Sequence, residues 1–312
     1  MGKVAFVFSG QGAQYSGMGK SLYEASPAAK AVFDTAEQIR PGTIAQCFES
    51  PVEELSVTKN TQPCLFCVDL AAAEALREAG VAADAVAGFS LGEVAAVTFA
   101  GMFTAAEGFS LVVKRGEAMQ AAAEKVDSAM AAILKLSNEK VEELCRMHQG
   151  VYPVNYNCPG QLVAACCKAE LESFCSRVKE FKGKAVPLAV SGGFHSPFMD
   201  SAEQKLAAAM GQYHLHAPKI PIYANMTAQP YPQQDEACAP ILTGQVTHPV
   251  QWEKTIRRMA EDGFDTFIEV GPGKTLSGLV KKIIKDAKIY RVEDKATLES
   301  TLEALRTPSE EE

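Results

Sequence analysis

The residues best suited to chemistry in this 312-residue sequence begin with a serine held between two glycines. Residues 88–92, GFSLG, match G-x-S-x-G, in which the glycines let a strand turn sharply into a helix and leave the serine hydroxyl exposed at the turn. Ser90 is therefore a candidate nucleophile for acyl groups. Taken alone, the same letters could also be a glycine-rich turn with an incidental serine.

A serine nucleophile needs a neighbouring base, and the sequence has five histidines. His195 lies in VSGGFHSP, a glycine-rich loop that can aim an imidazole at a neighbouring site. His148 ends an expected helix, and His214 and His216 alternate in an expected surface segment, so solvent-exposed roles suit these three. His195 is the candidate base.

Acyl transfer also needs donors for the negative charge that develops on the carbonyl oxygen. Gln11, in a Gly-Gln-Gly turn after an expected first strand, and Leu91, next to the candidate nucleophile, can each offer a backbone N–H. By itself, the first turn is better interpreted as an ordinary strand-to-helix connection.

Cys64 and Cys67 form C-x-x-C, which raises a redox or zinc site as an alternative chemistry. The pair opens the run CLFCVDLAAAEAL, which is typical of a buried helix, and no second Cys or His pair lies at ligand spacing. We expect core packing and no metal site. The nine scattered cysteines favour reduced thiols over a disulfide framework.

The elements that must position these residues alternate between strand and helix patterns, which predicts an α/β fold with a parallel sheet. Buried-strand patterns lie at 3–8, 85–88, 220–224 and 266–270, and helical patterns at 21–38, 63–79, 92–100, 252–262 and 274–285.

Between residues 126 and 191 the pattern changes to β-α-β-β-α-β, the order of a ferredoxin-like unit. Its expected strands lie at 130–136, 151–155, 162–167 and 185–190, and its expected helices at 138–148 and 170–181. We therefore expect a large subdomain in two parts, at 1–125 and 192–306, with a small subdomain inserted at 126–191 and a flexible acidic tail at 307–312.

Composition argues against two classes of function. The net charge of −8 disfavours nucleic acid, whose binding proteins need a basic face. No run of about 18 apolar residues occurs, and the apolar start is too short for a signal peptide. We expect a cytoplasmic protein without a membrane role, and a monomer by default.

Seven motifs along the chain together resemble one enzyme family. They are FSGQGAQYSGMG near the start, TQP at 61–63, GFSLGE at 88–93, KRGEAM at 114–119, NYNCPGQ at 155–161, FHSP at 194–197 and EVGPGKTLSGL at 269–279. In this order they look like malonyl-CoA:acyl carrier protein transacylases and the acyltransferase domains of polyketide synthases. Collinear motifs over residues 1–285 are far more specific than any one of them.

The resemblance implies an α/β-hydrolase-like large subdomain, a ferredoxin-like small one and an active site in the gorge between them. It implies Ser90 as nucleophile and His195 as base, with a backbone carbonyl near Gln245 orienting the imidazole. The backbone N–H groups of Gln11 and Leu91 would form the oxyanion hole.

The same resemblance assigns four substrate-binding residues. Arg115 would hold the free carboxylate of malonyl, because a guanidinium grips a carboxylate through two parallel hydrogen bonds, although an arginine on a helix is usually a solvated charge. Phe194 would leave little room for an α-methyl branch, and Gln62 and Asn157 would line the site by hydrogen bonding.

Two positions depart from the family pattern. Phe89 replaces the histidine that usually precedes the nucleophile, and it cannot donate a hydrogen bond. Ser9 stands where proline is common. Neither departure changes the expected nucleophile, base or arginine.

The predicted activity is transfer of malonyl from coenzyme A to the pantetheine thiol of an acyl carrier protein, through a malonyl-serine intermediate, for fatty-acid or polyketide synthesis. No metal or other cofactor is expected, because a thioester is already activated. Two alternatives remain: a serine thioester hydrolase on the same scaffold, for which Arg115 would serve no purpose, and a catalytically silent docking domain.

Acyl carrier proteins of this kind are acidic, so an enzyme of net charge −8 should present a local basic patch to its partner. Two lysine clusters are candidates, although helical lysines are usually only solvated. They are Lys179, Lys182 and Lys184, and Lys281, Lys282 and Lys285.

Overall fold

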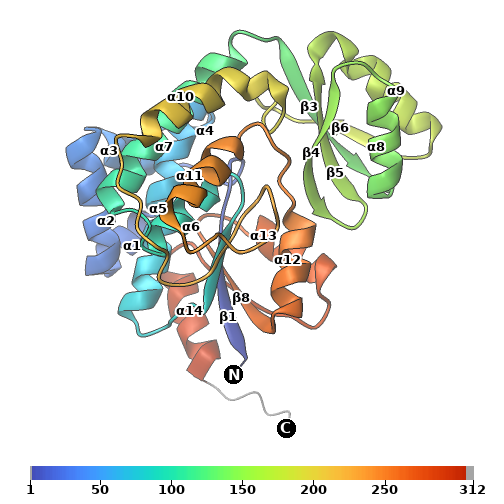
Figure 1. Cartoon of the computed structure of the whole chain (residues 1–312). Helices are drawn as coiled ribbons and strands as arrows, with labels where there is room; N and C mark the ends of the chain where they lie inside the picture. Colours follow the sequence, from blue (N-terminus) through green and yellow to red (C-terminus); the bar gives the residue numbers. More distant parts are fainter. Residues whose placement is uncertain (1, 307–312) are drawn as a thin grey trace.

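The chain is organised around two separate β-sheets, as Figure 1 shows. The computed structural model describes residues 2–306, with the backbone alone at 235 and 236, so the expected tail at 307–312 lies outside the described residues. The larger sheet is parallel, in the order β7-β2-β1-β8-β9, which confirms the α/β prediction. Its strands are β1 (Lys3–Phe8), β2 (Ala85–Gly88), β7 (Ile222–Tyr223), β8 (Phe264–Val270) and β9 (Lys288–Val292).

Both faces of the parallel sheet are covered by helices, because successive residues of a strand point in opposite directions and both sets are apolar. In β1, Phe6 and Phe8 pack into the larger core, whereas Ala5 and Val7 pack into the smaller one. The smaller core lies under α12 (Trp252–Glu261) and α13 (Thr275–Ile283). The larger core lies under α1 (Lys20–Ala25), α2 (Pro27–Ile39), α3 (Thr43–Glu49), α4 (Val52–Leu55), α5 (Thr58–Glu78), α6 (Leu91–Phe99), α7 (Ala105–Ala123), α10 (Asp200–Met210), α11 (Asp235–Gly244) and α14 (Lys295–Arg306).

The smaller sheet is antiparallel, in the order β4-β5-β3-β6. Its elements follow the expected order along the chain: β3 (Ser128–Leu134), α8 (Asn138–Arg146), β4 (Val151–Cys158), β5 (Gln161–Cys167), α9 (Leu171–Glu180) and β6 (Lys184–Pro187). Both helices share one apolar core with this sheet, through residues such as Leu144, Phe174 and Ile133. In Figure 1 this sheet and its helices stand apart from the parallel sheet.

One short segment of the larger part hydrogen-bonds directly to the smaller sheet. Val250, between α11 and α12, donates its N–H to the carbonyl of Val154 at 2.8 Å and accepts the N–H of Tyr156 at 2.9 Å. Val154 and Tyr156 both belong to β4. The segment just after α11 is therefore fixed to the antiparallel sheet as well as to its own part of the chain.

Some expected boundaries differ from the structure, mostly at prolines. The helix expected at 63–79 begins at Thr58 instead, with Pro63 inside it. The single helix expected at 21–38 is two helices, because the Ser26 hydroxyl accepts the N–H of Ala29 and caps a new helix whose first residue is Pro27. Strand β6 ends at Pro187, earlier than expected. The chain also adds β9 and α14 after the last expected helix.

None of the helices in the described part of the chain is long and apolar enough to cross a membrane.

Candidate active site

Ser90 occupies a strained turn between β2 and α6. Its backbone φ is 54° and ψ is −106°, a conformation that residues other than glycine rarely adopt. Both flanking glycines are required, since a Cβ on Gly88 would lie 2.0 Å from the carbonyl carbon of Gly92, and a Cβ on Gly92 would lie 2.3 Å from the carbonyl oxygen of Phe8. The turn is thus fixed sterically, as expected for a nucleophile elbow.

The base lies directly beside the nucleophile. His195 Nε2 is 2.7 Å from Ser90 Oγ, and His195 Nδ1 is 2.9 Å from the carbonyl oxygen of Gln245. Because a carbonyl can only accept, Nδ1 carries the proton, which leaves Nε2 free to accept the proton of the serine hydroxyl. The pair matches the arrangement expected from the sequence, including the backbone carbonyl of Gln245.

The loop that carries His195 is held by two serines. The N–H of Gly193 donates to Ser128 Oγ at 2.8 Å, and the hydroxyl of Ser196 donates to the carbonyl of Gly193 at 2.5 Å. His195 itself has a φ of 60° and is buried. Burial lowers the pKa of His195 to about 4, with a further lowering from the charge of Arg115. The imidazole is therefore neutral and able to act as a base at neutral pH.

Arg115, on α7, is a buried cation next to the nucleophile, with an exposed fraction of 2%. Its Nη1 donates to Gln62 Oε1 at 2.7 Å, and its Nη2 donates to Gln245 Oε1 at 2.6 Å and to Ser90 Oγ at 3.3 Å. Among the side chains that the structure describes, no carboxylate forms an ion pair with this guanidinium, and its Nε has no hydrogen-bond partner. Burial lowers the pKa of Arg115 to about 10, so it stays charged at neutral pH.

A buried guanidinium with an unused donor is unfavourable unless an anion can reach it. Gln62, expected to line the site by hydrogen bonding, accepts a hydrogen bond from Arg115, and neither residue is among those that line the cavity.

A cavity of about 270 Å³ opens over the nucleophile and takes its walls from both sheets. It is lined by Gln11, Ser90, Phe194, His195 and Asn157 among the expected site residues. Asn157 Oδ1 is buried and has no partner in the described part of the chain, so it can accept a hydrogen bond from a bound molecule. Apolar wall is added by Met119, Met130, Val163, Leu188, Val190 and Leu279.

Of the two residues expected to supply oxyanion donors, Gln11 lines the cavity and Leu91 directly follows Ser90 in the chain. Leu91 is the first residue of α6, where backbone N–H groups have no partner within the helix. The Gln11 side chain donates to Thr58 Oγ1 at 3.3 Å, which ties its turn to α5. In residues 2–306 neither backbone N–H donates to a protein acceptor, so both are available to a substrate oxygen.

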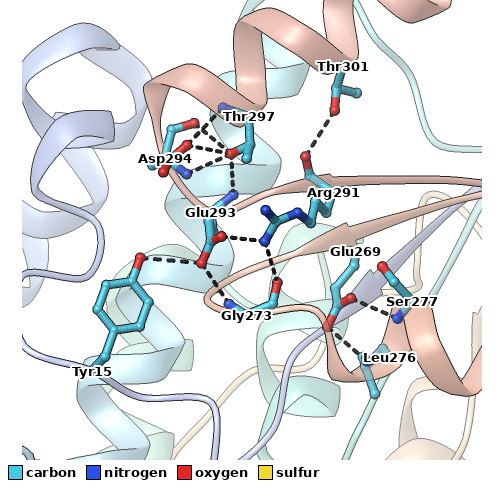
Figure 2. A network of polar contacts seen from close by, with 10 residues as sticks. All are labelled: Tyr15, Glu269, Gly273, Leu276, Ser277, Arg291, Glu293, Asp294, Thr297 and Thr301. Carbon is cyan, nitrogen blue, oxygen red and sulfur yellow. Dashed lines mark hydrogen bonds and ion pairs between the residues drawn. The ribbon is translucent and has the colours of Figure 1, made fainter.

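Tyr15, four residues after Gln11, is linked through Glu293 to the segment after β8, as Figure 2 shows. The hydroxyl of Tyr15 donates to the Glu293 carboxylate at 3.3 Å, and the same carboxylate accepts the N–H of Gly273 at 2.8 Å. On the neighbouring cavity wall, the Glu269 carboxylate accepts the N–H groups of Leu276 and Ser277 and so caps α13.

Both departures from the family pattern have a structural role. Ser9 donates its N–H to the carbonyl of Val270 at 3.1 Å and its hydroxyl to buried Asp69 at 2.7 Å, and proline could make neither bond. Phe89 lines the cavity and packs its ring edge against Trp252, with centroids 5.4 Å apart. Phe89 therefore joins the nucleophile turn to α12 by apolar contact.

Sequence reasoning missed three buried polar residues around the elbow. Asn225 accepts the N–H of Ser90 at 2.7 Å and donates to the carbonyl of Gly88 at 2.5 Å. Glu93 and Tyr231 hydrogen-bond each other at 2.8 Å. The one available signal was Glu93 itself, a carboxylate in the otherwise apolar run LGEVAAVTF.

The alternative chemistry at C-x-x-C receives no support from the structure. Cys64 and Cys67 are both fully buried in α5, which confirms the core-packing prediction, and both are free thiols.

Comparison with known proteins agrees with the site. Residues 5–301 match the acyl transferase domain family. The chain is 38% identical to the malonyl CoA-acyl carrier protein transacylase of Bacillus subtilis (strain 168), over 98% of each chain, and 35% identical to that of Synechocystis, over 93% of this chain and 97% of the relative.

Solved structures show the same likeness. The transacylase of Clostridium perfringens superimposes with a TM-score of 0.94 at 37% identity, over 97% of each chain. A malonyl-transacylase in complex with its type II PKS acyl-carrier protein superimposes with a TM-score of 0.92 at 34% identity, over 97% of this chain and 99% of that one. The chain belongs to the acyl transferase family, and within it to the malonyl CoA-acyl carrier protein transacylases.

Proposed function

We propose that this enzyme moves a malonyl group from coenzyme A to the phosphopantetheine thiol of an acyl carrier protein by way of a malonyl ester on Ser90, as a supply step for fatty-acid or polyketide synthesis. One observation carries the substrate assignment: the buried guanidinium of Arg115 lies 3.3 Å from Ser90 Oγ and keeps an unused Nε donor. A malonyl carboxylate is the anion that this position suits.

In the first half-reaction, His195 Nε2 takes the proton of Ser90 Oγ as this oxygen bonds to the thioester carbonyl carbon. The carbonyl electrons move onto oxygen, where the N–H groups of Gln11 and Leu91 stabilise the charge. The carbon–sulfur bond then breaks, and the coenzyme A sulfur leaves with the proton from His195. A malonyl-serine ester remains.

The second half-reaction is the same sequence in reverse. The pantetheine thiol gives its proton to His195 and its sulfur attacks the malonyl ester, and Ser90 leaves with that proton. Both half-reactions exchange one acyl bond for another, so no cofactor is needed beyond the two thiol carriers.

Substrate selection would depend on two residues near Ser90. Arg115, whose Nη2 lies 3.3 Å from Ser90 Oγ although the residue is not among those that line the cavity, would anchor the malonyl carboxylate. Phe194, on the cavity wall beside the base, would restrict branching at the α carbon. Asn157 Oδ1 would accept a hydrogen bond from an amide N–H of the pantetheine arm. The thioester hydrolase is not favoured, because a hydrolase of alkyl acyl groups would gain nothing from a buried arginine.

We also propose the finer description of the fold: an α/β-hydrolase-like large subdomain at 1–125 and 192–306, with a ferredoxin-like insert at 126–191. The turn at Ser90 between β2 and α6 supports the first part. The strand order β4-β5-β3-β6, with α8 and α9 packed on one sheet, supports the second. Location in the cytoplasm and the monomeric state stay predictions from the sequence.

For the carrier protein, we propose the lysines at the end of α13 as its docking cluster. A solved relative is a malonyl-transacylase in complex with its acyl-carrier protein. Lys281 and Lys282 lie in the last turn of α13, whose earlier residues Thr275 and Leu276 line the cavity, so a partner bound there would hold its thiol close to the opening.

The docking cluster is tested by charge reversal. Lys281→Glu with Lys282→Glu should raise the Michaelis constant for the carrier protein by about tenfold at low salt and leave that for malonyl-CoA unchanged. The matched control is Lys179→Glu with Lys182→Glu on the small subdomain. If only this control pair raised the constant, docking would belong to the small subdomain instead.

The activity itself is tested by intact mass after brief incubation with malonyl-CoA. The parent should gain one malonyl group, Ser90→Ala should gain none, and Arg115→Ala should be acylated about ten- to a hundredfold more slowly by malonyl-CoA but not by acetyl-CoA. Free malonate without an adduct would indicate the hydrolase. An unmodified protein with no turnover would indicate a silent domain.

A further inference from the structure

A fully buried carboxylate lies behind the active site without touching the cavity. Glu93, in the first turn of α6, has an exposed fraction of 0% and is not among the residues that line the cavity. Its Oε1 accepts the N–H of Asn225 at 3.1 Å and the hydroxyl of Tyr231 at 2.8 Å, and its Oε2 accepts a hydrogen bond from Gln245 Nε2. The proposed mechanism assigns this group no task.

Gln245 connects Glu93 to Ser90, Arg115 and His195. Its Nε2 also donates to the carbonyl oxygen of Ser90 at 2.8 Å, and its Oε1 accepts from Arg115 Nη2 at 2.6 Å. Its backbone carbonyl accepts the Nδ1 proton of His195 at 2.9 Å. A displacement of this one residue would therefore move the substrate anchor and the base together.

Glu93 is one of three groups, with the Ser90 carbonyl and Arg115, that favour the orientation of the Gln245 amide. The amide nitrogen faces two acceptors, the Glu93 carboxylate and the Ser90 carbonyl, and the amide oxygen faces the guanidinium of Arg115. If the amide were rotated by half a turn, its oxygen would face the carboxylate and its nitrogen would face a cation. The orientation seen is the one in which every pair is attractive.

Glu93 also offsets part of the cost of burying Arg115, without forming an ion pair with it. It is the group whose negative charge raises the pKa of Arg115, against the lowering by burial. The hydrogen bonds from Gln245, Tyr231 and Asn225 and the charge of Arg115 counter the effect of burial on Glu93, whose pKa is raised to about 7. The Gln245 amide lies between the two charges with its dipole aligned to both.

We propose that Glu93 is a positioning residue for the transfer reaction: through the Gln245 amide it holds the Arg115 guanidinium in place for the malonyl carboxylate and holds the backbone carbonyl that orients His195. This inference rests on the proposed function for its substrate part and on the geometry alone for its effect on His195.

The test is Glu93→Gln, which keeps the size of the side chain but replaces one acceptor oxygen by an NH₂ group. Two quantities are measured, each per folded active site. The first is the rate at which a neutral serine-directed fluorophosphonate modifies Ser90, and the second is the ratio of the acylation rates with malonyl-CoA and with acetyl-CoA. We expect the first to fall by about a hundredfold and the malonyl-to-acetyl ratio to fall by roughly tenfold. A role in stability alone would change neither quantity per folded site.

The matched control is Val97→Ala, a fully buried apolar residue on the same helix that takes no part in the polar network. It should lower the midpoint of thermal unfolding and leave both per-site rates as in the parent. If Glu93→Gln behaved like this control, with parent rates and an unchanged malonyl preference, the proposal would be wrong.

If Glu93→Gln does not fold, the same two quantities are measured on Glu93→Asp, which keeps the charge but withdraws the carboxylate by one methylene. Lower malonyl preference and slower phosphonate reaction would support the proposal, and parent values for both would overturn it. Should the parent itself fail to accept malonyl, the proposed function fails, but slower phosphonate reaction in Glu93→Gln would still establish the positioning of His195.

Discussion

Ser90 Oγ lies between a base and a cation, and the two neighbours act on each other. Arg115 Nη2 is 3.3 Å from this oxygen and His195 Nε2 is 2.7 Å from it. Burial lowers the pKa of His195 most, and the positive charge of Arg115 lowers it further, so the empty site holds a weakened base. A carboxylate bound to Arg115 would cancel much of that charge, so the basicity of His195 would rise in part when malonyl is present.

The pH dependence should show this coupling. In the free enzyme, kcat/KM for malonyl-CoA should fall in two steps as the pH drops: a partial fall near pH 7, where protonation of Glu93 (pKa about 7) removes the charge that helps to hold Arg115, and a complete loss towards pH 4, where protonation of His195 (pKa about 4) removes the base. The acid limb of kcat, which reports the complex, should lie at higher pH with malonyl-CoA but not with acetyl-CoA. Coinciding acid limbs for both substrates would show that Arg115 and His195 are not coupled.

A second prediction at this scale concerns the wall beside the base. Phe194 lines the cavity and is the residue immediately before His195. Phe194→Ala should raise the rate of acylation by methylmalonyl-CoA relative to malonyl-CoA by about tenfold. Loss of the ring makes room for the α-methyl group, and accommodating one methyl-sized group in an apolar pocket changes a relative rate by about this factor. Competition between the two thioesters, followed by mass of the adduct, measures the ratio. Equal ratios in parent and variant would place the discrimination elsewhere.

At the scale of elements, the active site depends on close backbone approach where β2 turns into α6. Gly88 and Gly92 both lack space for a Cβ, whereas Gly278, in α13, has no atom within 4 Å of the position its Cβ would take. The same substitution should therefore have opposite effects at Gly92 and Gly278, although both residues lie on helices.

Gly92→Ala should abolish acylation and lower the stability markedly, because its Cβ would overlap the end of β1. Gly278→Ala should stabilise the protein by roughly 0.5–1 kcal/mol, since alanine restricts the unfolded chain and favours the helix. Urea unfolding of both variants beside the parent measures the difference. A destabilised Gly278→Ala would mean that α13 moves closer to its neighbours than the structure shows.

Elements differ in how far their sequence predicts them. The turn at Ser90 is predictable because its determinants, two glycines and a serine, are adjacent in the chain. Helix α5 was misplaced because Pro63 is typical of a helix start, yet here it lies inside a helix that begins at Thr58. The site residues named by a motif were brought together around Ser90, whereas Asn225, 135 residues later, carries no local signal for its hydrogen bond to the nucleophile.

At the scale of the whole molecule, the catalytic pair is assembled from two sheets. Ser90 comes from the parallel sheet, and His195 follows β6 of the antiparallel one, so the cavity exists only where the two parts meet. This meeting could not be predicted from composition or periodicity, because both describe one element at a time. The collinear motifs implied it, since they come from both parts of one known architecture.

The two hydrogen bonds between Val250 and β4 also limit how this enzyme can be recombined with its relatives. Both bonds join backbone atoms, so a chimera with crossovers at 126 and 191 keeps them if the foreign β4 has the same length and register and no proline at position 156. A residue inserted into or deleted from β4 would instead shift the segment that carries Val250 and Gln245, whose carbonyl orients His195. Exchange of residues 126–191 between relatives is therefore limited by the length of one strand, with its effect felt at a histidine outside the exchanged part.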